Sequence, residues 1–251
     1  MTEKDVEAFV AAQQQMAAAP PVLGVVPKPG RTIPFIGMRQ VIAQRMTESL
    51  QTMAQVTATT EVDVSEMVKL REQLKTRFEL TYNDIIVKAV TIALKDHPLV
   101  NSTLVGDEIY VLEEMHIGVA VALEDGLIVP VVRDADKRTL AGIAKETRRL
   151  AEAARAGTLT VDEATGSTFT ITNLGMYGVD ISTPIINPPE VAILGVGRIV
   201  EKPAVYQGDI VKRSMMALSL TFDHRIVDGA PAAAFLKTLA GILEKPYLLF
   251  I

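Results

Sequence analysis

The spacing of apolar residues along this chain switches repeatedly between the helical period of three to four and the strand period of two. Helices are predicted over 38–53, 65–78, 83–95 and 139–156, and from 230 onward. Strands are predicted over 56–64, 115–123, 127–132, 168–173, 191–200 and 214–222, with hairpin turns at 106–107, 124–126 and 207–209. Helices and strands do not alternate regularly, so the pattern predicts a mixed α/β domain and disfavours a Rossmann fold.

Composition narrows the functional classes. The hydrophobic fraction of 49% is ample for a core, and a net charge of -5 argues against a nucleic-acid surface. Cysteine is absent, which excludes disulfides and a cysteine nucleophile, and the three histidines show no metal-ligand spacing. Because no apolar run approaches the length of a membrane span, we expect a soluble protein of the cytoplasm, or of the mitochondrial matrix in a eukaryote.

The first part of the chain differs from the rest. Residues 2–13 have the spacing of a short amphipathic helix, too short to form a core, and 14–32 are an Ala/Pro-rich linker. We expect residues 1–13 to be the end of a preceding domain and 33–251 to be the globular domain.

The stretch from Leu220 to Ala230 is the strongest candidate for chemistry. A buried strand breaks into a polar turn that holds His224, with Asp228 and Gly229 following before a helix begins. The imidazole is the side chain whose unperturbed pKa lies nearest to neutrality, so it can take and return a proton. The alternative is an ordinary strand, turn and helix with a core histidine.

A second candidate is the alternating segment 168–175, in which Phe169 and Ile171 share one face and threonines share the other. At the end of this strand the Thr172 hydroxyl is placed to donate to a developing oxyanion, although threonine is also simply common in strands. We expect His97 to be structural or exposed and assign little functional weight to His116. The sequence has no phosphate-binding GxGxxG or Walker motif and no GxSxG, which disfavours NAD chemistry, nucleotide hydrolysis and a serine hydrolase.

Taken together, these segments resemble the catalytic domain of the dihydrolipoyl acyltransferases of 2-oxo acid dehydrogenase complexes. The matching segments are Ile36–Arg39, Ile42–Met46, Val56–Val64, Ile117–Val121, Gly126–Val131, Thr168–Gly175, Pro184–Gly197 and Asp223–Gly229. The helix in residues 1–13 is similar to the last helix of the family's peripheral-subunit-binding domain. Most of that domain is missing, so we do not expect it to bind the decarboxylase and dihydrolipoyl dehydrogenase components, and no lipoyl-lysine can be named.

The resemblance implies a two-layer α/β sandwich with a mixed sheet, of the chloramphenicol acetyltransferase type, built into trimers and larger cores. It implies that coenzyme A and a lipoyl group carried by a lipoyl domain are the substrates, without a metal. His224 would be the general base, and Thr172 of a neighbouring subunit would donate to the oxyanion. Asp228 would form an ion pair that supports the loop, with Arg45 as its partner or Arg39 as the alternative, and Asn173 and Gly229 would help to order the site.

Two alternatives remain open from the sequence. The chain is either an active acyltransferase, with acetyl slightly favoured over succinyl or branched-chain groups, or a non-catalytic assembly core. An antibiotic acetyltransferase with the same His-x-x-x-Asp-Gly is a third hypothesis, disfavoured by the linker and the N-terminal helix. The apolar segment 247–251 independently suggests a surface for a partner.

Overall fold

The structure is a computed structural model that describes residues 30–123 and 126–250. The chain divides into two units, residues 1–36 and 37–251. In the first unit the described residues, 30–36, contain no helix or strand. The helix expected over 2–13 and the linker up to residue 29 lie outside the described residues.

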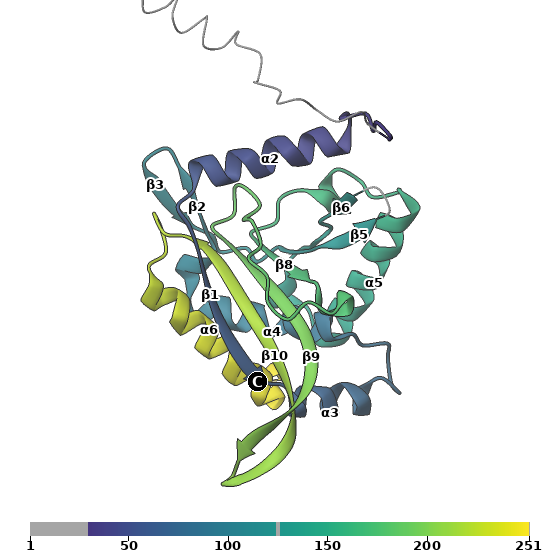
Figure 1. Ribbon diagram of the computed structural model, residues 1–251, viewed down its shortest axis with the longest axis vertical. Helices are drawn as coiled ribbons and strands as arrows, with labels where there is room; N and C mark the ends of the chain where they lie inside the picture. The colour runs from purple at the N-terminus through teal and green to yellow at the C-terminus, as the bar shows by residue number, and fades with distance from the viewer. Residues whose placement is uncertain (1–29, 124–125, 251) are drawn as a thin grey trace, which may run out of the picture. The chain divides into compact units, whose positions relative to one another are not determined.

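The second unit is organised around a six-stranded mixed sheet with the strand order β1-β10-β9-β8-β4-β7 (Figure 1). The strands are β1 (Gln55–Asp63), β4 (Ile117–Val119), β7 (Val131–Val132), β8 (Phe169–Asn173), β9 (Ala192–Tyr206) and β10 (Asp209–Asp223). β10 is antiparallel to both β1 and β9, whereas β8 runs parallel to β9 and β4. Two small hairpins stand apart from this sheet, β2 (Ser102–Val105) with β3 (Glu108–Val111), and β5 (Val121–Leu123) with β6 (Gly126–Ile128).

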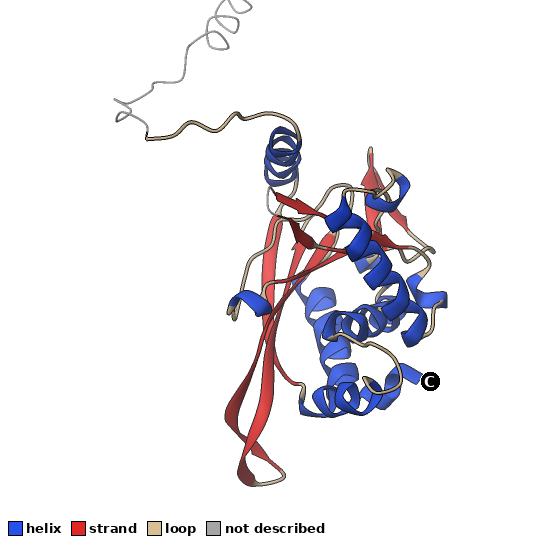
Figure 2. Cartoon of the chain, turned by 90° about the vertical axis from the view of Figure 1, so that its right-hand side faces the viewer, coloured by secondary structure: helices blue, strands red, loops and turns tan. Residues whose placement is uncertain are grey.

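Helices cover one face of the sheet (Figure 2). The helices of this layer are α3 (Ser65–Leu74), α4 (Tyr82–Asp96), α5 (Leu140–Ala156) and α6 (Gly229–Glu244). α2 (Met38–Thr52) instead lies across one end of the sheet (Figure 1), and short 3-10 turns occur at Pro98–Val100, Ala135–Lys137, Asp162–Ala164, Gly175–Tyr177 and Pro246–Phe250. α6 packs on β1 and β10, and its Phe235 ring lies 5.8 Å from the ring of Phe169 on β8. Phe169 and Ile171 are buried in this core, as the alternation of residues 168–173 predicts.

β9 and β10 form one long hairpin whose far end extends beyond the helices (Figure 2). The sequence predicted shorter strands with a separate hairpin at 204–211. Each strand instead has 15 residues, and the pairing continues through a register shift between Met216 and Leu218. A bulge of this kind lets a long strand twist without ending it.

The strand predicted over 115–123 is divided in two. β4 belongs to the main sheet, but after Ala120, whose N–H donates to the Ile171 carbonyl at 2.9 Å, the chain leaves that sheet and pairs as β5 with β6. The start predicted for α4 is also corrected. The helix begins at Tyr82 rather than at residue 83, and Thr81 forms its N-terminal cap in a reciprocal capping box with Asp84.

Candidate active site

His224 follows directly on the last residue of β10, in the turn before α6. Its ring lies beside Phe222, with centroids 5.7 Å apart, and its Nδ1 is 3.7 Å from Oδ1 of Asp228. The side chain is 44% exposed, and within the described chain its Nε2 has no hydrogen-bond partner. Nε2 of His224 is therefore accessible to a substrate, while Nδ1 of the same ring faces the Asp228 carboxylate.

The turn that carries His224 is held by Asp223. One oxygen of this buried carboxylate accepts from the Ala54 N–H at 3.2 Å, and the other accepts from Nη2 of Arg225 at 2.6 Å. The His224 N–H donates to the Ala54 carbonyl at 2.8 Å. Burial raises the pKa of Asp223, but the Arg225 guanidinium and the backbone donors outweigh it, so the pKa lies below its usual range.

The resemblance assigns Asp228 an ion pair that supports this loop, and within one chain Asp223 also holds the turn. The Asp228 side chain is 81% exposed, and within the described chain it forms no ion pair with Arg45 of α2. A pairing of Asp228 with Arg45 therefore remains a prediction for contacts between subunits. The signal that was missed is an acid and an arginine two positions apart, at the end of an otherwise apolar strand.

Gly229 is the first residue of α6, and a Cβ added there would meet nothing within 4 Å. Nothing in the described chain therefore requires a glycine at this position. It leaves open space beside Asp228, next to the His224 turn.

Thr172 lies on β8, directly opposite Gly195 of β9, and its hydroxyl has no hydrogen-bond partner within the described chain. The next residue, Asn173, receives the Gly175 N–H on Oδ1 at 2.9 Å and donates to Oδ1 of Asn83 at 2.6 Å. A Cβ at Gly175 would lie 2.7 Å from the Gly197 carbonyl oxygen, so the turn after the strand needs a glycine. Thr172 thus presents a free donor on a fixed strand end.

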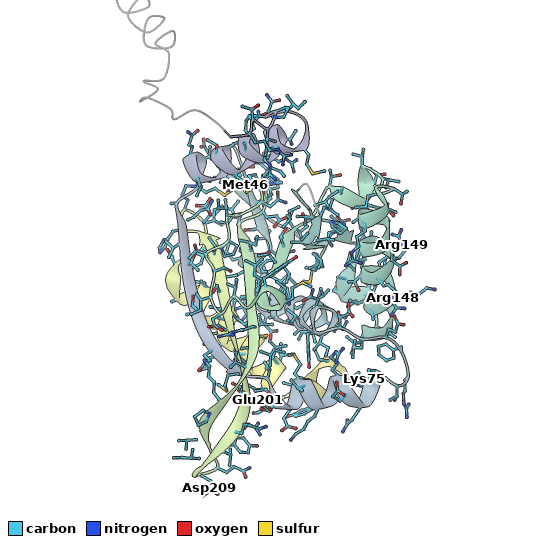
Figure 3. The ribbon with its side chains drawn as sticks, turned by 45° about the vertical axis from the view of Figure 1, so that its right-hand side comes forward. Met46, Lys75, Arg148, Arg149, Glu201 and Asp209 are labelled. Carbon is cyan, nitrogen blue, oxygen red and sulfur yellow. The ribbon has the colours of Figure 1, made fainter. Side chains whose placement is uncertain are left out.

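An open cleft of about 1220 Å³ reaches Thr172 and Asn173. Its walls come from the α3–α4 connection, β5 and α5, and basic side chains line it, among them Lys75 and Arg148 (Figure 3). Lys75 pairs with Glu72 and Arg148 with Glu79, and all four groups are substantially exposed. The sequence did not reveal this cleft because its lining residues lie on separate elements. The basic residues of α5 also have the spacing expected of a solvent-exposed helix face, which gave no sign of a cleft.

His224 and Thr172 do not meet within one chain. Thr172 stands opposite Gly195, which stands opposite Ser219 on β10, so the two residues are two strands apart and five residues apart along the strand. With ordinary strand dimensions the separation is about 19 Å. Groups that far apart cannot act on the same carbonyl.

The other two histidines have structural partners. The His97 ring nitrogen Nε2 lies 2.8 Å from the Thr238 hydroxyl, beside Phe235. His116 is buried, and its Nδ1 accepts from the Asp134 N–H at 3.1 Å. Across residues 30–123 and 126–250, no cluster of three or more His, Cys, Asp or Glu side chains is arranged to hold a metal ion, and no helix is long and apolar enough to span a membrane.

Comparison with protein families gives a match over residues 27–251 to the 2-oxoacid dehydrogenases acyltransferase catalytic domain. The acetyltransferase component of the acetoin cleaving system of Bacillus subtilis is 43% identical over all of this chain and 64% of its own length. The lipoamide acyltransferase of the branched-chain alpha-keto acid dehydrogenase complex of Pseudomonas putida is 41% identical, over 99% of this chain and 60% of its own length. A Bacillus subtilis succinyltransferase of the 2-oxoglutarate dehydrogenase complex is 45% identical over 85% of this chain and 53% of its own length. The chain thus spans between about half and two thirds of these relatives.

Solved structures of the same family superpose on this chain. The cubic core of the pyruvate dehydrogenase multienzyme complex superposes with a TM-score of 0.87 at 35% identity, over 92% of this chain and 98% of that one. The same values hold for Azotobacter vinelandii dihydrolipoamide acetyltransferase, studied for the catalytic roles of a serine, a histidine and an asparagine. In that protein the serine precedes the histidine by 52 positions and the asparagine follows it by 4. Chloramphenicol acetyltransferase shares the fold alone, at a TM-score of 0.52 and 14% identity, over 85% of this chain and 99% of that one.

Proposed function

The chain belongs to the family of 2-oxoacid dehydrogenase acyltransferase catalytic domains, and on that premise we propose that it transfers an acyl group between a dihydrolipoyl thiol and coenzyme A. The observation that carries this proposal is the spacing of the two free functional groups. Thr172 precedes His224 by 52 positions and Asp228 follows it by 4, the spacings found for the serine, histidine and asparagine of the Azotobacter enzyme.

The proposed reaction is a direct exchange of thioesters. Nε2 of His224 takes the proton of the coenzyme A thiol, and the sulfur attacks the carbonyl carbon of the acyl-dihydrolipoyl group. The C–S bond to the lipoyl sulfur then breaks, and His224 returns the proton to that sulfur. A thiol with an ordinary pKa of about 8.5 needs only modest help from a base near neutrality.

Thr172 is proposed as the donor to the tetrahedral oxyanion. Its hydroxyl has no hydrogen-bond partner within the described chain, so it costs no existing bond to direct it at a developing charge. One donor of this kind is typically worth about 3–4 kcal/mol of transition-state stabilisation.

The cleft that reaches Thr172 is proposed to admit coenzyme A. Its volume of about 1220 Å³ is large enough for an elongated ligand, and the exposed cations that line it, which include Lys75, Arg148 and Arg155, suit the phosphate groups. The dihydrolipoyl substrate would then approach from the His224 side.

Because His224 and Thr172 are about 19 Å apart in one chain, we propose that the complete site forms between two subunits, with one residue from each. A trimer gives three equivalent sites of this kind. The match to a cubic core supports further assembly into a large particle, where lipoyl domains would deliver the acyl group.

Acetyl is the proposed acyl group. The support is the 43% identity to an acetyltransferase over the whole chain, and the stretch Ser219–His224, which resembles acetyl-transferring members. Relatives that handle succinyl and branched-chain groups are equally similar in sequence, so competition between acetyl-, succinyl- and isobutyryl-coenzyme A in one assay decides this point.

The His224→Ala variant tests the function. Rates of transfer to dihydrolipoamide should fall about 100-fold to 10,000-fold, the usual contribution of a general base, while assembly stays unchanged because the side chain is half exposed. An assembled variant with full activity would refute the catalytic role and favour the non-catalytic core. Chloramphenicol as acceptor serves as the control for an antibiotic acetyltransferase.

A further inference from the structure

Glu190 stands two residues before β9 with only 1% of the residue exposed, and neither the sequence analysis nor the proposed reaction gives it a role. Three donors converge on its Oε1: the Ser167 hydroxyl, the Thr170 hydroxyl at 2.8 Å and the Asn187 side-chain amide at 3.1 Å. Its other oxygen, Oε2, is buried without a hydrogen-bond partner in the described chain. A buried carboxyl with this many local bonds needs an explanation.

The groups joined by Glu190 belong to two segments. Ser167 lies just before β8 and Thr170 lies on it. Asn187 belongs to the segment 182–190, which precedes β9. Thr170 and Thr172 are two residues apart on one strand, so their side chains share a face. Glu190 therefore holds the strand one step before the proposed oxyanion donor.

The same segment also covers the position next to Thr172. A Cβ built on Gly195, which pairs with Thr172, would lie 3.0 Å from the Ser182 hydroxyl and 3.3 Å from the Pro184 ring. Farther along, the Ile186 N–H donates to Gln55, and Gln55 pairs with Asp223 beside the His224 turn. The segment 182–190 thus runs from the base of the histidine turn to the strand that carries Thr172.

We propose that Glu190 is a positioning residue for the acyl transfer: its carboxyl ties β8 to the segment 182–190 and so fixes where Thr172 presents its hydroxyl. This inference rests on the proposed function. It adds a residue that touches neither substrate and acts through Thr170.

The surroundings of Glu190 favour an uncharged carboxyl. Hydroxyls and an amide face it, and no charged group of the described chain contributes to its pKa. On the adjoining strand end, His116 is engaged by Glu114 and the Asp134 amide, and Thr103 of β2 donates to the Pro189 carbonyl. Burial raises the pKa of Glu190 from 4.5 to about 7, against the three hydrogen bonds that lower it.

Ionisation of Glu190 would place an unpaired negative charge on Oε2, which has no hydrogen-bond partner in the described chain. The contact between β8 and the segment 182–190 would then have to loosen or admit water. The proton is bound more tightly in the folded state, so stability is greatest below 4.5 and is lost as the pH rises through about 7. Glu190→Gln keeps the shape and the accepting oxygen but cannot ionise.

The kinetic test compares wild type with Glu190→Gln in the assembled protein from pH 6 to 8.5. The two should have equal kcat at pH 6. At pH 8 the wild type should be slower by about tenfold, because about one molecule in eleven stays neutral one unit above the pKa. KM for coenzyme A should not differ, since Thr172 acts on the transition state.

Two controls separate positioning from general stability. Glu113→Gln removes an exposed carboxyl and should follow wild type at every pH. In a Thr172→Ala background the Glu190→Gln change should have no pH-dependent effect on kcat, because no hydroxyl remains to be placed. A constant kcat ratio across the pH range, or a pH effect that persists without Thr172, overturns the inference.

Thermal unfolding of the same variants gives a readout that does not need catalysis. The Tm of Glu190→Gln should exceed that of wild type by a margin that grows from pH 5 to pH 8, and a margin independent of pH overturns the neutral carboxyl. If wild type transfers no acyl group to any acceptor, the proposed function fails and the positioning role fails with it. The thermal series alone then decides the charge state of Glu190.

Discussion

At the scale of single residues, the two proposed catalytic groups differ in how the fold prepares them. His224 extends from a turn fixed by Asp223 and Ala54, whereas the Thr172 hydroxyl is fixed only by the strand that carries it. The histidine is therefore placed by hydrogen bonds to its own loop, and the threonine by the sheet.

The Thr172 hydroxyl should account for a large part of the rate. Thr172→Ala should lower kcat about 100-fold to 1,000-fold, because a preorganised donor is lost, and KM for coenzyme A should change little. Thr172→Ser keeps the hydroxyl and should remain within about tenfold of wild type. Steady-state kinetics of both variants test this, and equal losses in Ala and Ser would show that the methyl group matters rather than the donor.

At the scale of elements, the turn between β10 and α6 depends on an ion pair between the buried Asp223 carboxylate and the half-exposed Arg225 side chain. Asp223→Asn removes the charge that Arg225 and two backbone donors satisfy, and should cost about 2 kcal/mol in the free energy of unfolding. It should also lower kcat, because the His224 turn loosens. Lys137→Met breaks an exposed pair instead and is the matched control, with a cost below about 1 kcal/mol.

The same pair predicts a pH dependence. The pKa of Asp223 is lowered in the folded state, so its contribution to stability is present above its ordinary value of 3.8 and is lost as the pH falls through the folded value. The Tm difference between wild type and Asp223→Asn should therefore shrink on acidification from pH 6 to pH 3. A difference that stays constant over this range would contradict the prediction.

At the scale of the whole molecule, the separation of about 19 Å between His224 and Thr172 predicts that activity belongs to the assembly. Separately inactive His224→Ala and Thr172→Ala chains should complement each other when mixed and reassembled. Each site takes His224 from one subunit and Thr172 from another, and in randomly mixed trimers each of these is intact in about half of the cases. About one site in four therefore contains both intact residues, and about a quarter of wild-type activity should return. Mixtures that stay inactive would place both residues in one chain's site.

The C-terminal turn predicts a second level of assembly. In Pro246–Phe250, Leu249 is buried in the core, whereas Tyr247 and Phe250 are each 61% exposed. Exposed aromatic side chains of this size favour a partner surface. Phe250→Asp should reduce the particle to smaller oligomers by analytical ultracentrifugation while Tm falls by only a few degrees, whereas Leu249→Asp should unfold the subunit.

Some of this protein follows from its sequence. Local periodicity fixes which residues of 168–173 face the core, and Thr139 and Gly157 cap α5 as their types predict. The turn that places His224 at a strand end also follows, because an apolar strand must stop where charged and polar residues cluster. These features depend on neighbours within a few positions, which the sequence displays directly.

Tertiary structure alone decided the rest. Asp223 holds the histidine turn because Ala54 of a distant segment brings its backbone to that carboxylate. Burial raises the pKa of Glu190, and one of the groups that surround it, Ser167, lies 23 positions away in the sequence, so a glutamate after two prolines gives no local sign of this. The cleft and the distance between His224 and Thr172 are likewise set by strand order. Burial and proximity come from contacts between remote segments, and periodicity carries no information about which segments meet.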